Sequence, residues 1–137
     1  MNKNIIITCL ILLVPHLLVA QSNYRVVFDL TSKDSVNQKN VIRWINEISR
    51  SDPKALLEVV LYGQSLDLVI KDRSPAPAVI SEFVANKNIS FKVCRIAMKN
   101  QRIDSSMLIQ GVGMVPDGIY EIISRQREGW GYIKVAH

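Results

Sequence analysis

Histidine and cysteine are scarce in this chain, and their positions limit the chemistry that it can perform. The 137 residues include two histidines, His16 and His137, and two cysteines, Cys9 and Cys94. His16 and Cys9 lie in an N-terminal segment that we expect to be removed. A Cys–His pair, a Ser-His-Asp triad or a multi-histidine metal site would then lack the residues that it needs. The sequence therefore predicts no metal and no other cofactor, and a single remaining thiol excludes an internal disulfide.

Runs of basic residues interleaved with aromatic residues are also missing. Lysine and arginine number 17 against 12 aspartates and glutamates, which gives a formal net charge of +5 at pH 7. This surplus is spread along the chain, so solvated surface charge is the simpler explanation and nucleic-acid binding is disfavoured.

The first twenty residues resemble a secretory signal peptide. A short, weakly basic start precedes an apolar run from Ile5 to Val14, and Ala20 provides the small residue expected at a cleavage site. A retained membrane anchor is the competing interpretation, but residues 5–20 are fewer than the roughly 20 that span a bilayer. We therefore expect cleavage near Ala20, export to the periplasm or the medium, and no membrane attachment afterwards. Residues 21–137 are then long enough for one domain.

Strand and helix patterns alternate along the mature chain. Apolar runs and period-2 patterns predict strands at Tyr24–Leu30, Ala55–Tyr62, Ile89–Cys94, Gly111–Val115 and Trp130–Val135. Apolar residues at helical spacing predict helices over about 35–50, 77–88 and 117–128. Residues 66–70 could form a short edge strand. Residues 98–107 are expected to form a loop that contains a short helix. The alternation predicts a three-layer α/β/α domain with a mainly parallel sheet of about five strands.

The stretch Ile89–Asn100 places Cys94 where a strand gives way to a loop. Ligands gather at the carboxyl ends of strands in open α/β sheets, so a thiol there is a candidate reactive group. Its sequence neighbours Lys92, Arg95 and Lys99 are cationic, and positive charge near a thiol favours the nucleophilic thiolate. The alternative is a small apolar core residue, since free cysteine is among the most buried residue types. Both interpretations stay open at this point.

Four segments of the chain, taken in order, resemble a known family. They are VVFDLTS at Val26–Ser32, VVLYG at Val59–Gly63, KVCRIAM at Lys92–Met98, and the long closing segment Gly111–Val135. Together they resemble the DsrE/DsrF-like sulfur-relay family, the group that contains the YchN-type hexameric proteins. The resemblance covers about Arg25 to Lys134 and implies the DsrE/DsrF-like fold.

The resemblance also implies a function for Cys94. Relay members carry sulfur as a persulfide on the matching cysteine and pass it between proteins by thiol exchange, which needs neither metal nor histidine. It further implies a trimer or hexamer and a sulfur donor or acceptor protein as partner. Lys92, Arg95 and Lys99 would support the thiolate, with Tyr62 and Gly63 at the end of the neighbouring strand. Tyr62 stands where many relatives have histidine, so no role of that histidine is carried over.

Two main hypotheses follow for the function. In the first, the exported protein accepts or carries sulfane sulfur on Cys94, as a sulfur carrier or transferase and not as a hydrolase or oxidoreductase. In the second, it is a non-enzymatic exported oligomeric binding or assembly module that keeps the fold without the sulfur chemistry. A third, less favoured hypothesis is small-ligand binding at the same strand ends, where Gly63 and Gly111-x-Gly113 could approach an anion, although no phosphate-binding glycine motif is present.

Overall fold

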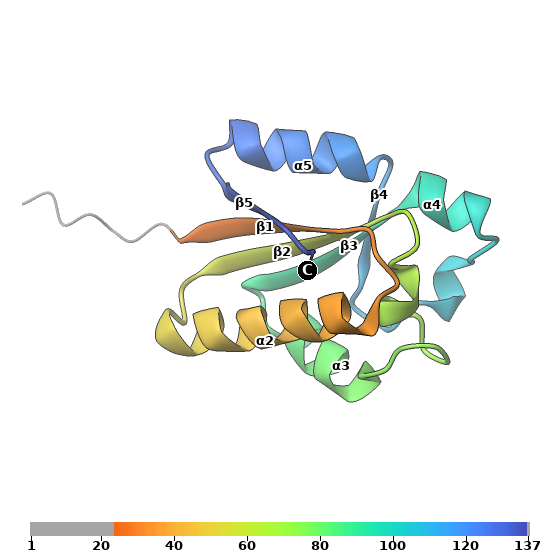
Figure 1. Cartoon of the computed structure of the whole chain (residues 1–137), viewed down its shortest axis with the longest axis horizontal. Coiled ribbons are helices and arrows are strands. Elements are labelled where there is room, and N and C mark those ends of the chain that lie inside the picture. The colour runs from red at the N-terminus through yellow and green to blue at the C-terminus, as the bar shows by residue number, and fades with distance from the viewer. Residues whose placement is uncertain (1–23, 137) are drawn as a thin grey trace, which may run out of the picture.

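Five parallel strands form the centre of the molecule (Figure 1). The computed structural model describes residues 24–136. The strands are β1 (Arg25–Leu30), β2 (Leu56–Leu61), β3 (Ile89–Cys94), β4 (Gly113–Val115) and β5 (Gly131–Lys134). They lie in the order β4-β3-β2-β1-β5, and each neighbouring pair is parallel. The predicted fold class is confirmed.

Helices cover the two faces of this sheet unequally. They are α2 (Ser35–Ser51), α3 (Pro77–Ala85), α4 (Arg95–Asn100) and α5 (Gly118–Arg127), with short 3₁₀ turns η1 (Leu66–Val69) and η2 (Ser105–Met107). Figure 1 shows α2 and α3 on one face and α5 on the other, which completes three layers. The short α4 follows β3 directly, at the edge where the strands end.

Side chains fix the beginnings of the three longer helices. The Asp34 carboxylate accepts a hydrogen bond from the backbone N–H of Val36 at 2.7 Å at the start of α2. Asp117 does the same for Ile119 at 2.8 Å at the start of α5. Pro77 occupies the first turn of α3, where its missing N–H costs nothing. The two aspartates thus satisfy backbone donors that have no partner inside the helix.

The main hydrophobic core lies between the sheet and α2 with α3. Alternate residues of the strands point into it, such as Phe28 on β1 and Phe91 on β3, and both are almost fully buried. The opposite face has a much smaller apolar cluster of Val27, Val60 and Ile122 under α5. This thin second core leaves room on that face for buried charged side chains.

Two details of the sequence-based prediction differ from the structure. Residues 66–70 form η1 and one antiparallel bridge from Ile70 to Leu108, so the predicted edge strand is wrong. The hydroxyl of Ser65, just before η1, donates to the carbonyl of Leu30 at 2.7 Å and ties this segment to the end of β1. A regular helix also begins immediately after Cys94, where a loop was expected, because Arg95–Asn100 continues the chain as α4.

The predicted signal peptide, its cleavage near Ala20 and export concern residues outside the described part of the chain. Within residues 24–136, no helix combines the length and the hydrophobicity needed to cross a bilayer.

Phe28 provides a test of the main core. It stacks on Trp44 with ring centroids 6.3 Å apart. Phe28→Ala is expected to lower the free energy of unfolding by about 3–5 kcal/mol, because it removes buried apolar surface and leaves a cavity. Urea unfolding followed by circular dichroism measures this loss. Val36→Ala, on an exposed part of α2, should change stability by less than about 0.5 kcal/mol; equal losses in both variants would contradict the assigned core.

Candidate functional site

Cys94 is the last residue of β3 and immediately precedes α4. Pairing in the sheet sets its neighbours: Leu61 lies opposite Val93, and Val115 lies opposite Cys94. The residues that follow β2 and β4 therefore reach the same edge of the sheet as the thiol. This is the arrangement that places sites at the carboxyl ends of parallel strands.

The thiol lies on the wall of a pocket of about 460 Å³. Residues after β2, from α4 and from the start of α5 line this pocket; they are Tyr62, Gly63, Gln64, Cys94, Ile96, Ala97, Asn100, Gln101, Asp117 and Ile119. Only 5% of the Cys94 surface is exposed. Cys94 is thus buried as a core residue would be, and it also lines a cavity at the strand ends.

Two glycines allow the backbone to close around Cys94. Gly63 has a φ of +61°, a conformation that other residues rarely adopt, and its carbonyl accepts a hydrogen bond from the Gln101 side chain. A Cβ on Gly118 would lie 3.2 Å from the Cβ of Cys94 and 3.2 Å from Val60. The first turn of α5 therefore lies so close to Cys94 that a side chain at position 118 would require its neighbours to shift by a few tenths of an ångström.

The cationic residues predicted to support Cys94 lie elsewhere. Arg95 and Lys99 line a neighbouring hollow of about 390 Å³ on the other side of α4. Lys92 points to the α5 face, near Gly113. The structure thus brings Tyr62 and Gly63 together with Cys94, but none of the three cations lines its pocket.

The pocket wall itself offers uncharged polar groups. Asn100, Gln64 and Gln101 contribute amides, and Asp117 is its one Asp or Glu. That carboxylate already accepts hydrogen bonds from the start of α5, at 2.8 Å from the N–H of Ile119. No group of three or more histidine, cysteine, aspartate or glutamate side chains that could hold a metal occurs within residues 24–136.

A polar cluster around Asp29 borders the pocket through Tyr62. The buried Asp29 carboxylate accepts hydrogen bonds from the Tyr132 hydroxyl at 2.7 Å and from the Lys134 ammonium at 3.0 Å. The same ammonium lies 5.8 Å from the centre of the Tyr62 ring. Burial, and then the negative charge of Asp29, raise the pKa of Tyr62, so its hydroxyl stays protonated at neutral pH.

Sequence reasoning did not find this cluster, because Tyr132 and Lys134 lie 103 and 105 residues from Asp29. One feature of the sequence could have indicated the cluster. Asp29 lies within an apolar strand, and a carboxylate that is buried there needs hydrogen-bonding or charged partners.

A second buried carboxylate, Glu58, holds α5 against the sheet. It accepts two hydrogen bonds from Arg125, both at 3.0 Å, and one from Ser90 at 3.1 Å. Arg125 also pairs with Glu121 at 3.1 Å. The pKa of Arg125 is raised, chiefly by the hydrogen bond to Glu58, and burial raises the pKa of Glu121. Glu121, which lies in the closing segment Gly111–Val135 that resembles the family, takes part in this ion-pair network.

Comparison with known proteins agrees with the fold and the segments that surround the site. A family model described as the DsrE/DsrF-like family matches residues 26–135, which include Cys94 and all five strands except Arg25, the first residue of β1. The chain belongs to the DsrE/DsrF-like family. No curated protein matches the chain.

Three solved structures illustrate the similarity of fold. The chain is similar to MTH1491, a protein of unknown function from Methanobacterium thermoautotrophicum, with 28% identity and a TM-score of 0.77 over 82% of this chain and 99% of that one. It shares its fold with the ychN protein of E. coli, with 14% identity, a TM-score of 0.69 and coverage of 82% and 98%. It also shares it with BT1422, a conserved protein of unknown function from Bacteroides thetaiotaomicron, with 17% identity, a TM-score of 0.66 and coverage of 83% and 97%.

The Asp29–Tyr132 hydrogen bond should make stability depend on pH in alkaline solution. It raises the pKa of Tyr132 from 10.0 to about 12. The unfolded chain therefore releases this proton first, so the stabilisation is complete below pH 10 and is lost as pH rises toward 12. Urea unfolding at several pH values from 10 to 12 measures the free energy of unfolding. This free energy should fall more steeply with pH in the wild type than in Tyr132→Phe. The same slope in both proteins would contradict the assigned hydrogen bond.

Proposed function

We propose that the protein accepts sulfane sulfur and carries it as a persulfide on Cys94. The observation that supports this most is the placement of the chain's described thiol on the wall of a pocket at the carboxyl edge of the sheet. Membership of a family generally associated with sulfur relay supports it as well. The protein would act as a sulfur carrier, not as a hydrolase or an oxidoreductase.

The proposed chemistry is thiol exchange without net oxidation. After the Cys94 thiol loses its proton to solvent, the thiolate attacks the outer sulfur of a donor persulfide. A new S–S bond forms at Cys94 while the donor S–S bond breaks, and its electron pair leaves with the donor thiolate. An acceptor thiolate then removes the outer sulfur from Cys94 in the same way. Neither step uses a metal or a histidine.

The pocket fits this intermediate in size and polarity. A volume of about 460 Å³ has room for the added sulfur beside Cys94, and the side-chain amides of Asn100 and Gln64 can serve as hydrogen-bond donors to a persulfide anion. Since no lysine or arginine lines the pocket, these uncharged donors take the role that the sequence assigned to Lys92, Arg95 and Lys99.

A protein partner could reach the pocket over an apolar rim. Ile96 and Ile119 line the pocket and are 53% and 56% exposed. Exposed apolar groups around a buried reactive atom suit a partner that delivers or receives sulfur at close range. We propose such a donor or acceptor protein as the partner, in the exported compartment predicted from the N-terminal segment.

Mass spectrometry tests the proposed carrier. The reduced protein is exposed to inorganic polysulfide, and peptide mapping should find additional sulfur on Cys94 of the wild type and none at residue 94 of Cys94→Ser. Mapping separates Cys94 from Cys9 if the N-terminal segment is present. A wild-type protein whose Cys94 is shown to be reduced, and stays unmodified, would refute the proposal.

A second candidate function is an assembly module without sulfur chemistry. The observation that favours it is an apolar surface on α5, where Ile119, Tyr120 and Ile123 are exposed, together with Ile96 of α4. Apolar residues gathered in this way are typical of protein interfaces. We propose that this surface forms a homo-oligomer, which the family resemblance suggests is a trimer or hexamer; the carrier function is compatible with the same assembly.

Changing the α5 surface should change the size of the protein in solution. The double variant Ile119→Asp/Ile123→Asp is expected to be monomeric, because two carboxylates would be buried without partners in the interface. Size-exclusion chromatography with light scattering measures the mass. Val36→Asp, at an exposed position on α2, is the control and should keep the wild-type mass. An unchanged oligomer in the α5 variant, or a monomeric wild type, would exclude this interface.

A further inference from the structure

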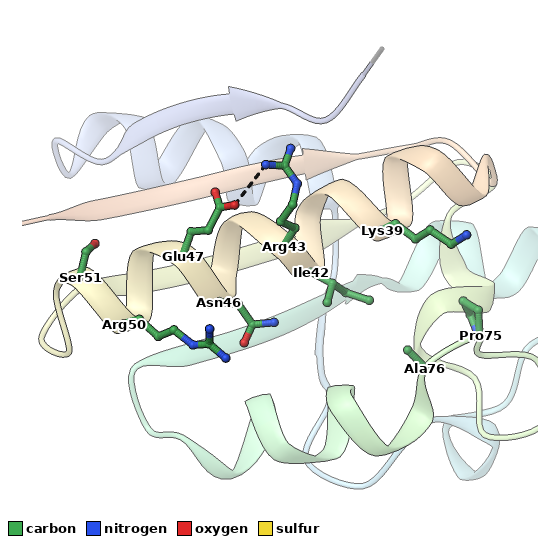
Figure 2. Close-up of a pocket in the computed structure, with 9 residues that line it drawn as sticks. All are labelled: Lys39, Ile42, Arg43, Asn46, Glu47, Arg50, Ser51, Pro75 and Ala76. Carbon is green, nitrogen blue, oxygen red and sulfur yellow. Dashed lines mark hydrogen bonds and ion pairs between the residues drawn. The ribbon is translucent and has the colours of Figure 1, made fainter.

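A further cavity lies along α2, on the opposite face of the sheet from α5 (Figure 1 and Figure 2). It has a volume of about 840 Å³ and runs along α2 beside the segment that leads into α3. We call it the α2 groove; its lining residues are Lys39, Ile42, Arg43, Asn46, Glu47, Arg50, Ser51, Pro75 and Ala76. None of them lines the Cys94 pocket, so whatever binds here does not depend on the proposed sulfur chemistry.

The side chains on one side of the groove follow a helical repeat. Lys39, Ile42, Asn46 and Arg50 are separated by three, four and four residues, so they form one stripe along α2. Figure 2 shows this stripe on the side of α2 that faces α3, with Lys39 directed toward Pro75. The two cations are at the ends of the stripe, about 16 Å apart at the rise of an α-helix. Between them lie the half-buried Ile42 and Asn46.

The groove has an excess of positive charge that the described chain does not neutralise. Arg43 and Glu47 form an ion pair at 3.1 Å, with both side chains more than half exposed, and so balance each other. Within residues 24–136, neither Lys39 nor Arg50 has an ion-pair partner or a side-chain hydrogen bond in the structure. Two cations with aliphatic stems, an isoleucine, Pro75 and Ala76 therefore surround an open, elongated cavity.

We propose that the α2 groove binds an acidic amphipathic helical segment of another protein. Its carboxylates, about eleven residues apart, would pair with Lys39 and Arg50, and its apolar side chains would pack against Ile42, Pro75 and Ala76. A single-headed amphiphile such as a fatty acid can satisfy only one end of the stripe. A second copy of this chain is a poor occupant, because each of its described α-helices contains at most one aspartate or glutamate and so cannot pair with both cations.

A peptide selection tests the occupant directly. Random peptides of roughly 16 residues, long enough to span both cations as a helix, are displayed and selected on the full protein and on an unrelated bait. We expect the enriched peptides to carry more aspartate and glutamate than the library, together with apolar residues at helical spacing. Their affinity, measured by fluorescence anisotropy, should fall at least tenfold with Lys39→Glu/Arg50→Glu and should weaken as salt is added.

A matched charge reversal serves as the control. Arg102→Glu/Arg127→Glu makes the same change in net charge at exposed positions outside the groove, and it should leave the affinity within twofold. Circular dichroism verifies that both double variants fold. Failure to enrich any peptide over the unrelated bait, enrichment without an acidic excess, or equal binding to both double variants would overturn the proposal.

Two other occupants would give distinct results. Binding to phosphatidylglycerol vesicles that requires Lys39 and Arg50, without any peptide enrichment, would assign the groove to a membrane surface. A smaller mass of Lys39→Glu/Arg50→Glu in light scattering, again without peptide enrichment, would assign it to a second copy of the chain. Either result would replace the acidic segment as the occupant.

Discussion

The packing of β3 in the interior of the sheet is the constraint on which the site depends. Ile89, Phe91 and Val93 are anchored in the main core, and β2 and β4 pair with the strand on either side. Cys94 is therefore held at the carboxyl edge of the sheet, beside the residues that follow β2 and β4. Because Gly118 has no side chain, α5 can begin directly against it. The position of the thiol at this edge of the sheet is a consequence of strand register, and the segments after β2, β3 and β4 form the pocket around it.

On the α5 face, where the apolar core is small, ion pairs and hydrogen bonds of charged side chains join the elements to one another. Glu58 joins β2 to α5 through Arg125, and Asp29 joins β1 to β5 through Lys134 and Tyr132. Buried carboxylates need such partners, and losing one partner leaves a charge with no compensation. The Asp29 cluster also sets the surroundings of Tyr62, so the same interactions that fix the edge of the sheet shape one wall of the Cys94 pocket.

The sequence predicted the strands and longer helices because their patterns are local, and the place of Cys94 followed from the strand that ends there. It could not predict where Arg95 and Lys99 point. They follow Cys94 in sequence, but α4 directs them into a separate hollow. Residues 66–70 show the same limit: alternating apolar residues indicated a strand, whereas tertiary contacts through Ser65 favour a 3₁₀ turn. The Asp29 cluster joins residues from both ends of the domain, so no local pattern reveals it.

The proposed sulfur transfer requires that the buried thiol can be reached through its pocket in the folded protein. The rate at which uncharged iodoacetamide alkylates Cys94 under native conditions, compared with the rate of global unfolding, tests it most directly. Peptide mapping assigns the label to Cys94. If the thiol is reached through the pocket, Cys94 is alkylated faster than the protein unfolds, and the alkylation rate rises in proportion to the iodoacetamide concentration. Alkylation that occurs only as fast as the protein unfolds, at every reagent concentration, would show that the sulfur is sealed in the core and would contradict the account.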